Sequence, residues 1–317
     1  MKPIMAHLSL SVVIPVHNEA NNLKRLDTEI KAALKRLDRP AEVIYVNDAS
    51  TDGSLKELSE LSDVTIITLR RRYGQATALG AGFSYATGDI IISLDGDGQN
   101  DPAEIPLLVS TLEERGLDVV AGWRKVRSDR NGIIMLTRIG RFLRHLIIKD
   151  TVHDTGCTFR AYRAEAAKSL SLTGEMHRYI LALLHWKGFT IGEVAVSDRE
   201  RAFGVSKYGY GKAIRGFIDL LYIWFIYKYS DRPLHLFGYM SLTSLLLAIV
   251  SAGFTAYDRI FRNLHVNRDG WFFLAFFFFI MAILLFSFGI IMDLLMRIYL
   301  NTSPNEQQYY VRSVVKK

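Results

Sequence analysis

The chain has 317 residues, half of them hydrophobic, and a formal net charge of +7. Its mean hydropathy of +0.13 is high for a soluble enzyme and low for a protein that consists only of membrane spans. The single cysteine, Cys157, excludes an internal disulfide, and the sequence shows no four-ligand Cys/His zinc pattern and no nucleic-acid-binding motif.

The first 121 residues alternate short apolar runs with amphipathic segments. The predicted strands are Leu8–Pro15, Val43–Val46, Val64–Leu69, Ile90–Leu94 and Val119–Ala121, and the predicted helices are Asn21–Leu37, Thr51–Leu61, Gly74–Ala86 and Pro102–Glu114. Strands rich in Val and Ile that alternate with helices predict a mainly parallel sheet covered on both faces. Ligands of such sheets bind at the carboxyl ends of the strands, so His17, Asp48 and Asp95 are expected to converge on one crevice.

The strand predicted at Ile90–Leu94 ends in Asp95-Gly96-Asp97-Gly98-Gln99. Because strand side chains alternate, Asp95 and Asp97 point to the same side. Hard oxygen ligands of this kind suit Mg²⁺ or Mn²⁺, which keep several waters and usually also bind substrate phosphates. The alternative is turn geometry alone, because junctions between strands and loops are rich in Asp and Gly.

Two long segments of the second half carry no charge: Leu234–Tyr257 after His235, and Trp271–Met292. At about 1.5 Å per residue, either segment is long enough to cross a hydrocarbon core of about 30 Å. Two buried helices of a soluble domain are the alternative. Lys and Arg are more frequent outside this pair of segments than between them, which predicts two membrane spans with both termini in the cytoplasm.

The segment before the first span is amphipathic. Apolar side chains recur in it at helical spacing, at Ile214, Phe217, Ile218, Leu221 and Phe225. Such a helix lies in a membrane interface or, alternatively, faces an ordinary core. The expected organisation is an α/β domain over 1–210, an amphipathic juxtamembrane helix over 211–232, two spans (234–257 and 271–295) within 233–300, and a cytoplasmic tail over 301–317.

Four further motifs accompany the Asp-Gly-Asp run. They are Pro15-Val16-His17-Asn18-Glu19, Asn47-Asp48-Ala49-Ser50-Thr51-Asp52-Gly53, Arg70-Arg71-Arg72-Tyr73-Gly74-Gln75 and His153-Asp154-Thr155-Gly156-Cys157-Thr158-Phe159-Arg160. In this order they resemble the family 2 inverting glycosyltransferases, whose GT-A fold is α/β and Rossmann-like. The segment Arg201–Tyr208, with the amphipathic helix and two spans after it, is similar to the polyprenyl-phosphate branch, which includes dolichol-phosphate mannose synthases and bacterial undecaprenyl-phosphate sugar transferases.

The resemblance implies a role for each motif. The nucleotide-sugar is expected to contact Pro15, His17, Glu19, Val46, Asp48, Asp95, Gly96 and Gln99. The metal, Mg²⁺ or Mn²⁺, is expected on Asp95, Asp97 and Gln99, with Asp97 also catalytic. Phosphate groups of the donor or the lipid are expected on Arg124, Arg138, Arg201 and Lys207, because cationic side chains make charge-assisted hydrogen bonds to phosphate oxygens. Relatives usually carry an aromatic or small residue in place of His17.

Asp154 is the residue that the resemblance implies as a catalytic base. The acceptor, a lipid monophosphate, is largely a dianion at pH 7 and needs orientation more than deprotonation. Asp154 is therefore expected to orient the sugar or bind a residual proton, unless it is only a turn residue before Gly156. His177 and Arg178, at a predicted helix start, are expected to reach the acceptor side or to be a solvated helix start.

The function implied is transfer of one sugar from a nucleoside-diphosphate sugar to undecaprenyl or dolichyl phosphate, with inversion. A UDP-sugar is the favoured donor, glucose first, with GDP-mannose as runner-up. The expected location is the inner (plasma) membrane, with the catalytic domain in the cytoplasm. The aromatic-rich spans and the branch resemblance hint at a homotetramer, and the oligomeric state stays open. The rival interpretations are a processive polysaccharide synthase, whose Gln-x-x-Arg-Trp signature is not visible, and a non-catalytic nucleotide-binding membrane scaffold.

Overall fold

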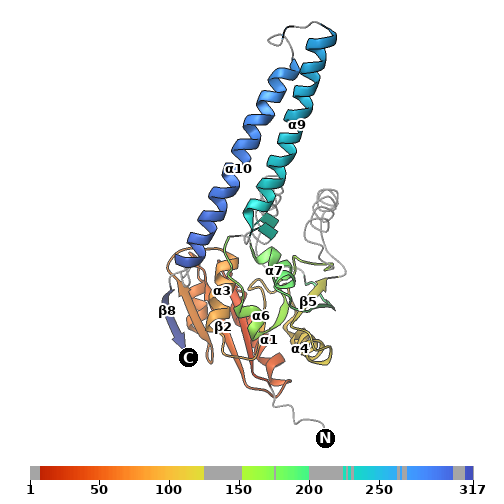
Figure 1. The fold of residues 1–317 in the computed structure, drawn as a ribbon. Coiled ribbons are helices and arrows are strands. Elements are labelled where there is room, and N and C mark those ends of the chain that lie inside the picture. The colour runs from red at the N-terminus through yellow and green to blue at the C-terminus, as the bar shows by residue number, and fades with distance from the viewer. Residues whose placement is uncertain are drawn as a thin grey trace. The chain divides into compact units, whose positions relative to one another are not determined.

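The computed structural model describes residues 8–124, 152–174, 176–199, 232–262 and 270–302, together with 224–225, 228–229, 265 and 311–316. The chain divides into two compact units, one made of Met1–Phe217 with Gln307–Lys317 and the other of Ile218–Glu306. The first unit is the α/β part and the second holds the two long apolar helices (Figure 1).

The α/β unit is built on one mixed sheet with the strand order β7-β5-β6-β4-β1-β2-β3-β8. Four neighbouring strands, β1 (Leu10–Val16), β2 (Ala41–Asn47), β3 (Thr65–Leu69) and β4 (Ile90–Ser93), are parallel, and β5 (Val119–Arg124) is parallel to β7 (Ile191–Val196). The strand β6 (Arg160–Arg163) runs antiparallel between β4 and β5. The predicted mainly parallel α/β sheet is confirmed.

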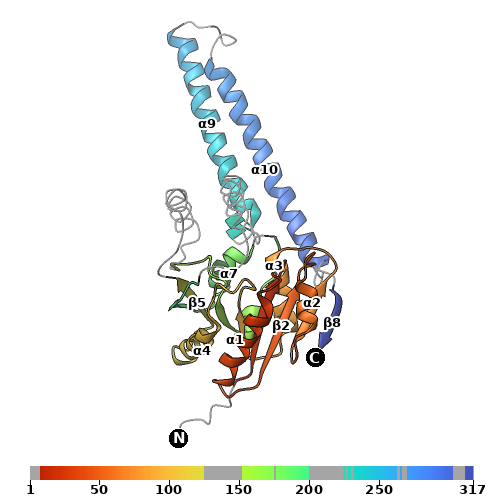
Figure 2. The same cartoon turned by 180° about the vertical axis from the view of Figure 1, so that it is seen from behind.

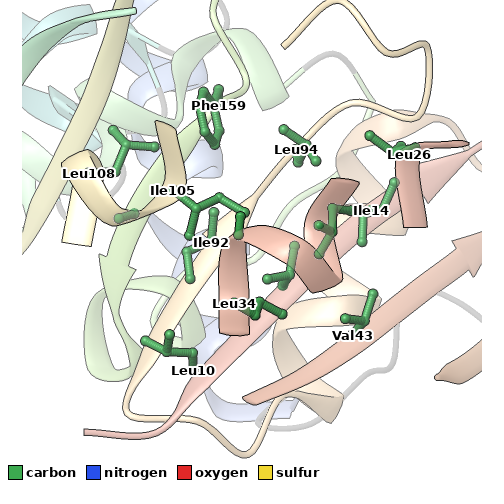
Figure 3. Close-up of a cluster of buried hydrophobic side chains, with 14 of the residues drawn as sticks. Leu10, Ile14, Leu26, Leu34, Val43, Ile92, Leu94, Ile105, Leu108 and Phe159 are labelled. Atoms are coloured by element: carbon green, nitrogen blue, oxygen red, sulfur yellow. The ribbon is translucent and has the colours of Figure 1, made fainter. Parts of the chain in front are cut away.

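Helices cover both faces of this sheet. On one face, α1 (Leu23–Lys35) and α4 (Ile105–Glu114), which follows the 3₁₀ turn η1 (Pro102–Glu104), pack on the sheet through a continuous apolar core. Figure 3 shows part of this core, with side chains from both helices and from the central strands. The short helix α2 (Ser54–Ser59) contacts α1.

The opposite face carries α3 (Gln75–Tyr85), which packs on β1 and β2 and contacts α6 (Ala164–Lys168). The small residues of α3 have a steric reason. A Cβ added at Gly82 would lie 2.2 Å from Cγ1 of Val13 and 3.1 Å from Cγ2 of Val46, so only glycine lets the helix approach the strands this closely. The described part of the unit also contains the 3₁₀ turn η2 (Met176–Tyr179) and α7 (Ile180–Trp186), which follows it directly.

The C-terminal segment adds β8 (Val311–Lys316), antiparallel to β3, at one edge of the sheet (Figure 2). The sequence did not predict this strand within the expected tail. An edge strand such as β3 exposes unpaired N–H and C=O groups, and β8 pairs with that edge.

The second unit consists mainly of α9 (Pro233–Phe261) and α10 (Gly270–Thr302), which run side by side (Figure 1). Both helices are long and apolar enough to cross a membrane, and only 17% and 11% of their most apolar windows are buried. Helices of a soluble core would be mostly buried, and apolar surface of this extent marks contact with lipid or a partner. The Oγ atoms of Ser241 and Ser244 donate hydrogen bonds of 2.8 Å to the carbonyl oxygens of Ala282 and Phe278 in the other helix.

The predicted amphipathic helix over 211–232 lies for the most part outside the described residues. The same holds for three predicted phosphate-binding residues, Arg138, Arg201 and Lys207.

Candidate active site

The ends of β1 and β2 meet through His17 and Asp48. The Nδ1 atom of His17 lies 2.8 Å from the backbone oxygen of Asp48, and because a carbonyl oxygen only accepts, Nδ1 carries the proton. The Asp48 carboxylate is buried and accepts hydrogen bonds from the N–H groups of Tyr73 (2.6 Å) and Gly74 (2.8 Å). Gly74 is the N-cap of α3, with φ of 93°, so Asp48 anchors the start of that helix.

The start of α3 also reaches the end of β4, where the Nε2 atom of Gln75 donates a 2.7 Å hydrogen bond to Oδ1 of Asp95. The turn after β4 packs on the end of β1, because a Cβ at Gly96 would lie 3.2 Å from the Pro15 oxygen and 3.6 Å from Cγ of Glu19. The structure thus brings the ends of β1, β2 and β4 together. Val46, by contrast, is fully buried and packs beneath α3.

Asp95 and Asp97 are neighbouring carboxylates whose charges oppose each other. Burial, and then the charge of Asp97, raise the pKa of Asp95 to about 6. Asp97 is 7% exposed, and its Oδ1 accepts a 3.1 Å hydrogen bond from the N–H of Gln99. A divalent cation would relieve the repulsion between the two carboxylates, and their hard oxygens suit it.

No group of three or more His, Cys, Asp and Glu side chains with metal-binding geometry occurs among the described residues. A cation on Asp95 and Asp97 would therefore need further ligands other than the His, Cys, Asp and Glu side chains of the described residues. Mg²⁺ is commonly bound in this way, by one or two carboxylates together with waters and substrate phosphates.

Arg124, at the end of β5, forms an ion pair with Asp154. Its Nε lies 2.8 Å from Oδ2 and its Nη2 3.3 Å from Oδ1 of that carboxylate, which is 5% exposed. The Nη1 atom lies 3.7 Å from Oδ1 of Asp198. Burial opposes the charge of Arg124, but the hydrogen bond and charge of Asp154 hold the pKa of Arg124 above its ordinary value. Two residues with separately predicted roles are thus paired with each other.

Asp154 also makes the predicted turn contact, because its Oδ1 accepts a 3.1 Å hydrogen bond from the N–H of Gly156. The turn interpretation and a functional role are therefore compatible at this residue. Glu193, in β7, accepts hydrogen bonds from the same segment and was not predicted from the sequence.

Arg160 acts on the carboxylates, and His177 in turn is affected by the charge of Arg160. Arg160, in β6, is 1% exposed, its Nη2 donates to the carbonyl oxygen of Thr155, and its charge acts on Asp95. Burial, and then the charges of Arg178 and Arg160, lower the pKa of His177 to about 3. The Nδ1 atom of His177 is buried and has no hydrogen-bond partner among the described residues, whereas Arg178 is exposed.

The segment before the predicted basic motif is tied to the turn after β4. The N–H of Arg199 donates a 2.9 Å hydrogen bond to the oxygen of Gln99, and its guanidinium lies 2.6 Å from Asp101 and 2.6 Å from Glu29.

Several known proteins are similar to this chain in sequence or in fold. The sequence profile described as Glycosyl transferase family 2 matches residues 11–171. The chain is 34% identical, over 97% of its length and 93% of the relative, to the dodecaprenyl-phosphate galacturonate synthase of Rhizobium johnstonii. It is 32% identical, over 97% of its length and 94% of the relative, to the undecaprenyl-phosphate 4-deoxy-4-formamido-L-arabinose transferase of Klebsiella pneumoniae.

Solved structures with a similar fold include glucosyl-3-phosphoglycerate synthase from Mycobacterium tuberculosis in complex with Mn²⁺ and UDP-glucose. The TM-score is 0.53 at 20% identity, and the match covers 68% of this chain and 79% of that one. At this identity the likeness shows the GT-A fold alone.

Proposed function

The chain belongs to glycosyl transferase family 2, and from this premise we propose that it transfers one sugar from a nucleoside-diphosphate sugar to a polyprenyl phosphate. The observation that carries the proposal is the extent of the similarity to polyprenyl-phosphate transferases. It covers 97% of the chain, so it includes the helices α9 and α10 as well as the α/β unit. A polyprenyl acceptor is confined to a membrane, which gives the apolar helices a reason to be there.

In the proposed reaction, a phosphate oxygen of the acceptor attacks the anomeric carbon of the sugar. The bond from that carbon to the donor's diphosphate breaks, and the nucleoside diphosphate leaves with the electron pair. A single displacement of this kind inverts the anomeric configuration. Because the acceptor is largely a dianion at pH 7, no proton needs to be removed from it.

We assign a divalent cation, Mg²⁺ or Mn²⁺, to Asp95 and Asp97, with Gln99 beside them. When bound, it would neutralise charge on the departing diphosphate. Support comes from the hard oxygen donors and from the burial and mutual repulsion that raise the pKa of Asp95. We place the nucleotide at the ends of β1 and β2, beside His17, Glu19 and Asp48.

Asp154 fits an orienting role better than that of a base. Its carboxylate oxygens already accept hydrogen bonds from Arg124 and from the N–H of Gly156. A carboxylate paired with a guanidinium is a poor proton acceptor, because that charge favours its ionised form. We therefore propose that Asp154 holds the sugar or Arg124 in place, and that Arg124 faces the phosphates.

The identity of the donor sugar is supported by fewer observations than the reaction class. A UDP-sugar is proposed, and glucose was the first expectation from the sequence, with GDP-mannose as runner-up. The whole-length relatives are named for galacturonate and for 4-deoxy-4-formamido-L-arabinose, neither of which is glucose. A donor panel must therefore contain glucose, galacturonate, amino-arabinose-type and mannose donors.

The direct experiment follows radiolabel from each donor into lipid extracted with organic solvent, using the purified full chain, Mg²⁺ and either undecaprenyl or dolichyl phosphate. Labelled lipid is expected with at least one donor. Labelled polymer would favour a processive synthase, and binding of nucleotide without any transfer would favour a scaffold.

We further propose that α9 and α10 span an inner (plasma) membrane and that the α/β unit is cytoplasmic, as the distribution of Lys and Arg favours. A cysteine introduced at His265, between the two helices, should react with an impermeant thiol reagent applied to intact cells. The native Cys157 is 1% exposed, so background labelling should be low. Labelling seen only after lysis would overturn the topology. A homotetramer stays a prediction, and cross-linking in the membrane tests it.

A further inference from the structure

Glu193 contacts the backbone on both sides of the peptide bond between His153 and Asp154. Its Oε1 accepts hydrogen bonds from the N–H groups of His153 (2.8 Å) and Asp154 (3.3 Å). Its Oε2 lies 2.7 Å from Nδ1 of the His153 ring, which therefore donates to it. One carboxylate thus receives three hydrogen bonds from two consecutive residues.

This carboxylate occupies an unusual place for a charge. Glu193 belongs to β7, in the otherwise uncharged run Ile191-Gly192-Glu193-Val194-Ala195-Val196, and its side chain is 14% exposed. A charged group at this depth is costly unless hydrogen bonds compensate it. The compensating hydrogen bonds come from His153 and from the backbone of Asp154. The position of the Glu193 side chain and the position of this loop therefore depend on each other.

The same loop is held from a second strand. The ring of His153 stacks on Trp123, with centroids 4.5 Å apart and planes at 19°. Trp123 precedes Arg124 in β5, and β5 and β7 are parallel neighbours in which Ala121 is opposite Glu193. Both partners of the Arg124–Asp154 ion pair are therefore fixed to adjacent strands, Arg124 by the backbone of β5 and Asp154 through Glu193.

The geometry points to Glu193 as the positioning residue of Asp154. Both of its carboxylate oxygens accept hydrogen bonds from the loop, and in this role Glu193 does not touch the reacting groups. Glu193 would fix the position of the backbone at Asp154, and Arg124 would fix the orientation of the Asp154 carboxylate. The inference rests on the proposed transfer reaction and on a role for Asp154 in it.

Two conservative substitutions separate position from charge. Glu193→Gln keeps the length of the side chain and can keep all three hydrogen bonds. Its amide oxygen still accepts from the two backbone N–H groups, and its amide nitrogen donates to Nδ1 of His153 once the imidazole takes its other tautomer. Glu193→Asp keeps the charge but shortens the side chain by one methylene. A positioning role predicts near-normal turnover for Gln and a loss of about ten- to a hundredfold in kcat for Asp, since displacement by about 1 Å is enough to slow a reaction this much.

The test measures kcat, KM for the donor and melting temperature of the full chain for both variants, alone and combined with Asp154→Asn. The matched controls are Glu114→Gln and Glu114→Asp at the exposed end of α4. The expected results are a kcat effect with little change in KM, and no further loss from Glu193→Asp once Asp154 is Asn, because residues that act as a unit are not additive.

Several outcomes would overturn the inference. They are equal turnover of the Gln and Asp variants, a larger loss for Gln than for Asp, a loss that follows the melting temperature, or a full additional loss in the Asp154→Asn background. Normal turnover of Asp154→Asn alone would remove the role on which Glu193 acts but leave the proposed function intact. Absence of transfer by the unmodified chain with every donor would instead refute the proposed function and this inference with it.

Discussion

The two halves of the site handle their carboxylates in opposite ways. At the ends of β1, β2 and β4, Asp95 and Asp97 lie together, and their mutual charge helps to raise the pKa of Asp95 to about 6. Beside β5 and β7, Asp154 is paired with Arg124 at the end of β5, and its loop is held by Glu193 within β7. Under the proposed function, a bound cation would stabilise the first half, whereas the carboxylate of the second half already has a counter-ion within the protein.

The largest expected effect comes from removing a charge in the first half. Asp97→Asn keeps an acceptor for the N–H of Gln99 but weakens cation binding, so turnover should fall about a thousandfold, equivalent to about 4 kcal/mol. Because repulsion on Asp95 is relieved, the melting temperature without metal should not fall. Asp63→Asn, at an exposed position with φ of 51° that Asn also tolerates, is the control. Full activity of the Asp97 variant, or of the unmodified chain in excess chelator, would contradict the assignment.

Removing a charge in the second half should act on stability first. Arg124→Ala leaves the buried carboxylate of Asp154 without its counter-ion, which typically costs about 3–5 kcal/mol. Urea unfolding in detergent should show this loss, and adding Asp154→Asn should recover part of it. Arg25→Ala breaks an exposed ion pair with Glu29 and should cost less than about 1 kcal/mol. Equal costs for Arg124→Ala and Arg25→Ala would show that the second half is not preassembled by this pair.

The basic segment after β7 should matter for turnover and not for stability. Arg201→Ala and Lys207→Ala are each expected to reduce transfer about ten- to a hundredfold, the effect of losing one charge-assisted phosphate contact. Arg201→Lys should rescue only in part, because an ammonium group cannot reproduce the two parallel hydrogen bonds of guanidinium. Lys168→Ala, exposed on α6, is the control. Near-normal transfer by both alanine variants, or losses that follow the melting temperature, would indicate a solvated basic surface.

The smallest effect is a dependence of metal-free stability on pH. The folded-state pKa of Asp95, about 6, lies above the unfolded value near 3.8, so the folded protein binds the extra proton and becomes less stable as pH rises through this window. Asp95→Asn should therefore stabilise the chain in chelator by about 1–3 kcal/mol at pH 7.5. The gain should disappear near pH 4. A gain that stays constant between pH 4 and 7.5 would mean that the ionised, buried carboxylate of Asp95 is not its source.

The half of the site at the ends of β1, β2 and β4 was easier to predict from the sequence than the half beside β5 and β7. The strands β1 to β4 follow one another along the chain as buried Val and Ile runs, and their parallel order places consecutive strand ends at one edge. The proximity of His17, Asp48 and Asp95 could be expected from that pattern, although their roles stay predictions.

The second half gave weaker signals. The strand β6 reads Arg-Ala-Tyr-Arg and contains the buried Arg160, a sequence that neither strand propensity nor hydrophobicity favours. Glu193 meets His153 across 40 residues of sequence, and β8 pairs with a strand more than 240 residues before it. Contacts of this kind depend on the completed sheet and leave no local periodicity to detect. A charged residue within the apolar run of β7 was the one available sign of Glu193.

The central claim, transfer of a single sugar to polyprenyl phosphate with inversion, is tested most directly by the structure of the lipid product. The full chain is incubated with the donor that labels lipid best, and the extracted product is analysed by mass spectrometry and by NMR of its anomeric carbon. The expected product carries one sugar per polyprenyl phosphate, with the anomeric configuration opposite to that of the donor. A product with retained configuration, a chain of several sugars, or free sugar with unmodified lipid would contradict the claim.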